Sequence, residues 1–206
     1  MGYVLYGNKA SGSFPVEAAL VKAGAPHRVV ELDLSKGDHE RSDFVAINPM
    51  RQVPALTLTD GTLMTESAAI VIYLAGAHPK AGLSPEPGTP AHARFLRWLV
   101  YMATNLYEAD LRYFYPDRYT TDPAGVPGVK AAGARHMART LEVIDQALAD
   151  GPFLAGRALS IADVYLAVLT TWSPEPVTAP RLLQVRQAVT DDQAYGQVWR
   201  AHGLAV

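Results

Sequence analysis

The residues around Ser11 have the types and spacing that can hold a bound anion. β-Forming residues at 3–6 precede a short polar stretch, and Pro15 then opens a segment rich in Ala, Leu and Val. This order predicts a strand, a loop and the first turn of a helix, where unpaired backbone N–H groups and the helix dipole favour negative charge. A hydroxyl at Ser11 could donate a hydrogen bond to a ligand thiolate there and lower the pKa of the thiol. The alternative is a helix cap, for which Ser13 is better placed.

A second set of polar residues surrounds a predicted hairpin. Residues 48–56 read Asn-Pro-Met-Arg-Gln-Val-Pro-Ala-Leu, and Asp60-Gly61 is a dipeptide suited to a tight turn between two antiparallel strands. Residues 65–70 read Thr-Glu-Ser-Ala-Ala-Ile and open a helix that we expect to run to about Ala77. This combination is far more specific than a serine near a helix start.

The segment 48–70 closely resembles the glutathione-binding half of the cytosolic glutathione transferases, in particular their bacterial theta-like and beta-like members. These proteins share the pattern N-P-x-x-x-V-P-x-L, an Asp-Gly hairpin and a Glu-Ser pair that opens a helix. The resemblance extends over almost the whole chain. It implies a thioredoxin-like N-terminal domain, of the α/β class, and an all-helical C-terminal domain.

The same resemblance implies binding roles for four residues of this segment. Val53 would pair through its backbone with the cysteinyl part of glutathione, and the bond before Pro54 would be cis. Glu66 would pair with the ammonium of the γ-glutamyl end, and Ser67 would meet its carboxylate at a helix N-terminus. Without the preceding Val-Pro pair, Glu66 and Ser67 would be interpreted as a first-turn acid and a simple cap.

Two further ligand candidates follow from the resemblance. Gln52 fits a position whose side chain contacts the γ-glutamyl or glycyl part of the ligand. His39 lies in a segment, 36–39, that resembles the region meeting the glycine carboxylate in theta-like members; an exposed loop histidine without a role is the alternative. Arg51 stands where many relatives have Gly or Lys, so it either adds a cation near the ligand or lies in solvent.

The thiol-activating residue is predicted to be Ser11. The resemblance places it where theta-like members carry a serine and beta-like members a cysteine, and this chain has no Cys. Any thiol chemistry must therefore use a thiol that a ligand brings. Tyr6 is the rival, because alpha, mu and pi members use a tyrosine at the end of the first strand, but its spacing to the helix is too long for a clean match.

The second half of the chain contains a predicted co-substrate pocket and a predicted helix cap. An apolar pocket with a few polar groups is typical of small-molecule sites, and core packing is the alternative for its residues. The residues expected to line it are Met102, Tyr107, Tyr113, Phe114 and Trp172. Ser160 and Asp163 stand three apart, as in a capping box at a helix start, and we expect this pair to be structural.

The elements that must position these residues follow from the spacing of apolar side chains. Residues 1–78 predict a βαβ unit followed by a ββα unit. Residues 79–90 concentrate Pro and Gly and predict a linker. Residues 91–206 keep helical spacing and predict an all-α domain, which would carry the co-substrate pocket.

Composition narrows the function classes for a chain of 206 residues. A net charge of −2 without clustered cations gives no reason to expect a nucleic acid or a membrane as partner. The lack of Cys excludes disulfides, thiolate zinc sites and iron–sulfur clusters, and we expect no metal. The first residues lack a basic stretch followed by a long apolar run, so a cytoplasmic protein is expected.

Together with the resemblance, these features predict a glutathione S-transferase with a detoxification role. It would conjugate its co-substrate glutathione to a small hydrophobic electrophile, and the family implies a homodimer. One alternative keeps the site but makes it a glutathione-dependent isomerase, dehalogenase or peroxidase. The other is a non-catalytic binding or scaffold protein of the same fold, because fold does not determine function.

Overall fold

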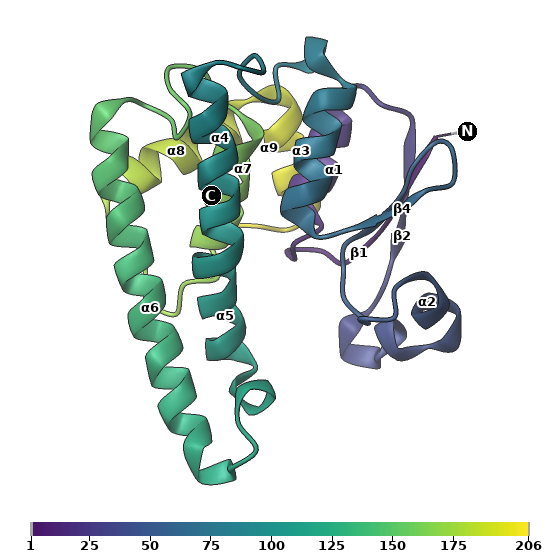
Figure 1. Ribbon diagram of the computed structural model, residues 1–206, viewed down its shortest axis with the longest axis vertical. Helices are drawn as coiled ribbons and strands as arrows, with labels where there is room; N and C mark the ends of the chain where they lie inside the picture. Colours follow the sequence, from purple (N-terminus) through teal and green to yellow (C-terminus); the bar gives the residue numbers. More distant parts are fainter. Residues whose placement is uncertain (1, 206) are drawn as a thin grey trace. The chain divides into compact units, whose positions relative to one another are not determined.

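The computed structural model describes residues 2–205, which form two compact units (Figure 1). The first unit comprises residues 2–84 together with 189–205, and the second comprises residues 85–188. This division differs from the domain boundaries expected from the sequence, where the helical domain ran to the C-terminus. The reason is α9 (Gln193–Ala201), which packs against α1 (Phe14–Lys22) of the first unit.

The first unit is built on a four-stranded sheet with the strand order β2-β1-β3-β4. β1 (Tyr3–Gly7) pairs in parallel with β2 (His27–Glu31), and α1 connects them as the crossover helix of a βαβ unit. β3 (Ala55–Thr57) runs antiparallel to β1, and β4 (Leu63–Thr65) runs antiparallel to β3. This is the expected order of the thioredoxin-like domain, which is confirmed.

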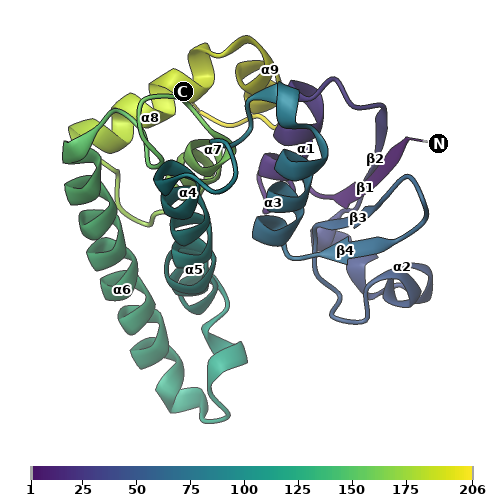
Figure 2. The ribbon, with the colours of Figure 1, turned by 45° about the horizontal axis from the view of Figure 1, so that its top comes forward.

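Helices cover both faces of this sheet. α1 and α3 (Ser67–Ala77) pack side by side on one face (Figure 2), where Leu5 and Ile70 are fully buried. On the other face, Phe44 of α2 (Ser42–Ile47) packs in an apolar cluster with Ala55 and Tyr6. The alternation of side chains along β1 explains the two cores, since Leu5 and its neighbour Tyr6 must point to opposite faces.

The second unit is helical, as predicted. α4 (Pro90–Tyr101), a π-helical turn (Met102–Leu106) and α5 (Tyr107–Phe114) follow one another without a break, and α5 packs against α6 (Val126–Ala147). The remaining α-helices are α7 (Ile161–Thr170) and α8 (Pro180–Asp191). Across both units, the short 3₁₀ turns are η1 (Leu34–Lys36), η2 (Asp38–Glu40), η3 (Pro79–Ala81), η5 (Pro116–Tyr119), η6 (Pro123–Gly125) and η7 (Leu148–Asp150). No helix within residues 2–205 is both long enough and apolar enough to span a bilayer.

The predicted capping box at the start of α7 is present. The Asp163 carboxylate accepts hydrogen bonds from the Ser160 N–H at 2.9 Å and from the Ser160 hydroxyl at 2.7 Å. It also accepts the Leu154 N–H at 2.8 Å, a contact from the preceding loop that the sequence did not predict. Asp163 therefore holds both the helix start and the loop that leads to it.

Candidate active site

The register of the sheet brings the predicted ligand residues other than His39 to one edge of the first unit. Ala55 of β3 pairs with Tyr6 on one side and with Thr65 on the other. Because β3 is antiparallel to both neighbours, the C-terminal ends of β1 and β4 lie beside the N-terminal end of β3. The segments that meet at this edge are the loop 8–13, residues 52–54 and residues 66–67. The helices α1 and α3 both begin there.

The strand β3 is preceded by a cis peptide bond between Val53 and Pro54, as the resemblance implied. Asn48 holds the loop before it, because its Nδ2 donates to the Gln52 carbonyl at 2.8 Å and its Oδ1 accepts the Met50 N–H at 3.1 Å. Asn48 is 4% exposed, and Pro54 is also buried, whereas Gln52 is exposed. Asn48 belongs to the 48–56 motif, but no role was predicted for it; an Asn before Pro at a turn was the available signal.

The connection from β4 to α3 presents a carboxylate beside a helix N-terminus. Glu66 has φ 65° and ψ 103°, a backbone conformation that residues with a Cβ rarely adopt. Glu66 is the N-cap residue of α3 rather than a first-turn acid, and its exposed side chain accepts no capping hydrogen bond from the helix. Strained residues of this kind concentrate at ligand sites. An ammonium could bind the Glu66 carboxylate, and a carboxylate could bind the helix start at Ser67.

Ser11 lies in the loop between β1 and α1. Its Oγ is 2.7 Å from the Asn8 carbonyl oxygen and 3.0 Å from Ser13 Oγ, and it accepts the Ser13 N–H at 3.2 Å. A hydroxyl has a single proton, so donating to a ligand thiolate would require Ser11 to release the Asn8 carbonyl. Ser13 is the N-cap residue of α1, but its side chain does not cap the helix and instead accepts the Asn8 N–H at 3.3 Å.

The rival residue Tyr6 is engaged in packing. Its ring lies 6.1 Å from that of Phe44, centroid to centroid, at the cluster formed with Leu32 and Ala55. Val53 packs at the same cluster. Tyr6 therefore has a structural reason to be where it is, independent of any catalytic role.

The segment that carries His39 follows β2 and is held by its own carboxylates. Asp33 accepts hydrogen bonds from Ser35 and pairs with Lys36 at 2.9 Å, and these contacts lower the pKa of the half-buried Asp33 to about 2. Lys36 is thus directed to Asp33. His39 lies on η2, half-buried, and its Nδ1 has no hydrogen-bond partner among the residues the structure describes.

The predicted co-substrate residues fall into separate groups within the second unit. Tyr107 and Trp172 meet edge to face, with ring centroids 5.2 Å apart. Tyr113 and Phe114 meet in the same way at 5.1 Å at the end of α5, where Phe114 is 52% exposed. Met102 is fully buried on the π-helical turn, so the core-packing alternative applies to it.

Asp110 on α5 is a buried acid that the sequence analysis missed. It is 2% exposed, and neither carboxylate oxygen has a hydrogen-bond partner in the described part of the chain. Burial raises the pKa of this carboxyl to about 8, so the group is protonated at neutral pH. The available signal was its place four residues after the buried Leu106 on a helix.

The chemistry available at the sheet edge is the binding of a charged, peptide-like ligand. It combines two helix N-termini, the carboxylate of Glu66, the hydroxyl of Ser11 and the backbone of Val53 before β3. Such groups complement carboxylates, an ammonium, an anionic sulfur and a peptide backbone, respectively. Across residues 2–205, no three His, Asp or Glu side chains are grouped as ligands of a metal ion.

Comparison with known proteins finds two family models that match this chain. The model described as "Glutathione S-transferase, N-terminal domain" matches residues 1–76. The model described as "Glutathione S-transferase, C-terminal domain" matches residues 127–201. The two models therefore match the first unit and much of the helical part.

Individual proteins give the same picture. The chain is 35% identical over 155 residues to glutathione S-transferase GstA of Escherichia coli O157:H7, and the match covers 75% of this chain and 74% of that protein. It is 31% identical over 174 residues to the uncharacterized GST-like protein YncG of Escherichia coli K12, covering 82% of each.

Solved structures extend the similarity to three dimensions. A glutathione transferase homolog from Sulfitobacter with bound glutathione superposes with a TM-score of 0.91 at 28% identity, over 99% of both chains. A sphingomonad glutathione S-transferase complexed with glutathione gives a TM-score of 0.82 at 30% identity, over 98% of this chain and 100% of the other.

Proposed function

This chain belongs to the glutathione S-transferase family, and from that premise we propose that it binds glutathione and conjugates its sulfur to a small hydrophobic electrophile. The observation that carries the proposal is the meeting of three features at one sheet edge. These are the backbone at Val53–Pro54, the Glu66–Ser67 corner and the Ser11 loop. Relatives with bound glutathione support the ligand.

Each part of glutathione has a complementary group in the proposed binding mode. The N–H and C=O of Val53 pair with the cysteinyl residue as an added strand would. The Glu66 carboxylate takes the γ-glutamyl ammonium, and the start of α3 at Ser67 takes its carboxylate. Gln52 contacts the γ-glutamyl or glycyl part, and His39 serves the glycine carboxylate.

Activation of the thiol is the proposed catalytic step. A cysteine thiol has a pKa of about 8.5, so only a few per cent is thiolate at neutral pH. The Ser11 hydroxyl turns from the Asn8 carbonyl to donate to the sulfur, and the N-terminus of α1 adds its dipole. The thiol proton leaves to solvent, the thiolate forms a bond to the electrophilic carbon, and the leaving group departs with the electron pair.

The second unit supplies the electrophile site in this proposal. Tyr107 and Trp172 form one apolar surface, and Tyr113 with Phe114 forms another, while Met102 supports the helix from the core. The family further implies a cytoplasmic homodimer with a role in detoxification, and we include both in the proposal.

The test is calorimetric titration of the protein with reduced glutathione, together with ultraviolet absorbance of the bound thiolate. Glu66→Ala and Glu66→Gly should each weaken binding by about tenfold or more, since a charge-assisted hydrogen bond contributes about 1.5–3 kcal/mol. Ser11→Ala should keep most of the affinity but lose the thiolate absorbance and most of the turnover.

The two Glu66 variants also test the backbone strain. Glycine tolerates a positive φ, so Glu66→Gly should be more stable than Glu66→Ala by about 1 kcal/mol although both lose the carboxylate. Glu142→Ala, which removes an exposed carboxylate on α6, is the control and should bind normally. Absence of binding by the unmodified protein at millimolar glutathione would refute the enzyme and favour a scaffold.

A further inference from the structure

The loop that carries Ser11 is held from the far end of the chain. The Ala10 N–H donates to Nδ1 of His202 at 3.1 Å, a contact between residues 192 positions apart within the first unit. Ala10 has φ 53°, a left-handed conformation that is unfavourable for a residue with a Cβ. Something must therefore stabilise this conformation, and the bond to His202 lies at the strained residue itself.

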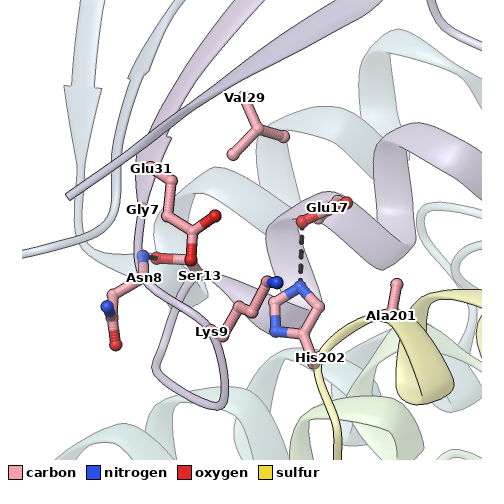
Figure 3. Close-up of a pocket in the computed structure, with 9 residues that line it drawn as sticks. All are labelled: Gly7, Asn8, Lys9, Ser13, Glu17, Val29, Glu31, Ala201 and His202. Atoms are coloured by element: carbon pink, nitrogen blue, oxygen red, sulfur yellow. Dashed lines mark hydrogen bonds and ion pairs between the residues drawn. The ribbon is translucent and has the colours of Figure 1, made fainter. Parts of the chain in front are cut away.

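The two ring nitrogens of His202 have distinct roles. A backbone N–H can only donate, so Nδ1 must be the acceptor and carries no proton. The proton is then on Nε2, which donates to Glu17 Oε2 at 2.9 Å on α1 (Figure 3). The ring also packs edge to face on Phe14, with centroids 5.2 Å apart, and His202 is only 7% exposed. The imidazole is thus fixed in tautomer and in orientation.

The surroundings explain why this bond matters for the loop. A cavity of about 210 Å³ borders the loop, lined in part by Asn8, Lys9 and Glu17 (Figure 3). Because that side of the loop faces a cavity, side-chain packing does not hold it there, and directional polar contacts decide its conformation. The bond from Ala10 is adjacent in sequence to Ser11, whose hydroxyl direction depends on the same backbone.

We propose that His202 is a positioning residue for Ser11: it links Ala10 to Glu17 on α1 and so holds the Ser11 hydroxyl at the N-terminus of that helix. The inference rests on the proposed function, in which Ser11 activates the thiol. His202 does not touch the substrate in this scheme and acts only through the loop. It adds to the site a residue from the C-terminal segment that no local motif connects with Ser11.

The test compares His202→Leu with His202→Asn in the full-length protein. Leucine removes the acceptor, whereas asparagine places an amide oxygen near the position of Nδ1. His202→Leu should lower kcat by about tenfold and raise the pKa of the bound glutathione thiol, while the Kd for glutathione changes by less than about threefold. His202→Asn should recover most of the loss. Glu17→Gln, which keeps an oxygen acceptor for Nε2–H, should behave like the unmodified protein.

Lys22→Met separates positioning from general docking of the C-terminal segment. Lys22 Nζ pairs with Asp192 Oδ2 at 2.6 Å and so also links α1 to the start of α9. Lys22 is the last residue of α1, whereas Ser11 precedes the first residue of this helix. Its loss should lower stability without changing the thiol pKa. If Lys22→Met reproduced the kinetics of His202→Leu, or if folded His202→Leu kept the normal kcat and thiol pKa, the proposal would be wrong.

Amide hydrogen exchange at residues 10–13 without glutathione gives an answer that does not depend on activity. Exchange should accelerate in His202→Leu and return towards normal in His202→Asn. Unchanged exchange in both would overturn the inference even if the enzyme is an active transferase. Failure of the unmodified protein to bind glutathione would instead refute the proposed function, and with it the catalytic part of this inference.

Discussion

Asp110 shows how one buried acid makes the stability of this molecule depend on pH. Its carboxyl is 2% exposed and has no partner among the described residues, and burial raises its pKa from 3.8 to about 8. The folded protein therefore keeps this proton up to about pH 8, whereas the unfolded chain releases it above about pH 4. The contribution of Asp110 to the free energy of unfolding is fully present below the pKa of the unfolded chain. It is lost as the pH rises through the pKa of the folded protein.

Asp110→Asn should remove this dependence, because an amide does not titrate in this range. Relative to the variant, the unmodified protein should lose up to about 1.4 kcal/mol of unfolding free energy per pH unit between about pH 4 and 8. Urea unfolding at several pH values measures it, with the exposed Asp150→Asn as control. Parallel curves for Asp110→Asn and the unmodified protein would mean that Asp110 is ionised and paired.

Glu66, Arg51 and Ala10 share a feature that is not visible in residue type. All three have positive φ without being glycine, at 65°, 57° and 53° respectively. Each lies in a connection that reaches the candidate edge of the sheet. Arg51 stands at a position where many relatives have Gly or Lys. Its left-handed backbone explains the Gly, because Gly adopts a positive φ without steric cost.

At the scale of elements, α7 depends on Asp163 more than a helix cap normally requires. A lost N-cap costs about 0.5–2 kcal/mol. Here the carboxylate also accepts the Leu154 N–H, and the group is completely buried. Removing it leaves two buried backbone donors without a partner, each of which costs about 1–3 kcal/mol.

Asp163→Ala should therefore lower the unfolding free energy by about 3 kcal/mol or more, above the range for a cap alone. The affinity of folded protein for glutathione should be unchanged, because Asp163 belongs to the second unit. Urea unfolding and calorimetric titration measure the two quantities. A loss confined to cap size would show that the Leu154 contact contributes little, and a large loss of affinity would contradict the structural role.

A π-helical turn, Met102–Leu106, joins α4 to α5, and both of its end residues are fully buried. Phe95, Trp98 and Leu99 keep α-helical spacing and are buried as expected. The turn Met102–Leu106 adds backbone between the two α-helical parts and changes the register of the residues after it. Tyr113 and Phe114, which the sequence placed in one pocket with Tyr107, meet each other at the end of α5, where Lys130 Nζ lies 4.7 Å from the centroid of the Tyr113 ring.

At the scale of the whole molecule, the C-terminal segment completes the first unit. Trp199 of α9 is fully buried and packs edge to face on Phe14 of α1, with ring centroids 5.4 Å apart. Two further residues of α1, Ala19 and Leu20, are also fully buried. The N-terminal half of the chain thus needs a segment from the other end to cover α1.

Trp199→Ala should lower the unfolding free energy by about 3–5 kcal/mol, the usual loss for a large buried aromatic side chain. Glutathione should stabilise the variant and the unmodified protein by the same amount, because ligand stabilisation depends only on the glutathione concentration and the Kd of the folded protein. Thermal and urea unfolding with and without glutathione measure this. Gln197→Ala, on the exposed face of α9, should change stability by less than about 0.5 kcal/mol, and equal losses in both variants would contradict the packing role.

By itself, the sequence determined the fold class, the βαβ-ββα order, the hairpin at Asp60-Gly61 and the family. These depend on local signals, such as strand and helix periodicity, turn dipeptides and a contiguous motif, and local signals are present in the order of the residues. The candidate residues of segment 48–70 were predictable for the same reason, since a short hairpin brings them together.

Only the tertiary structure decided which distant residues lie together and which are buried. The bond from Ala10 to His202, the burial of Asp110 and the assignment of α9 to the first unit each join parts of the chain that no local pattern connects. A histidine near a C-terminus or an acid on a helix has the same local signature whether it is exposed or buried. Its partners and its pKa are set by long-range packing and desolvation, which exist only once the chain has folded.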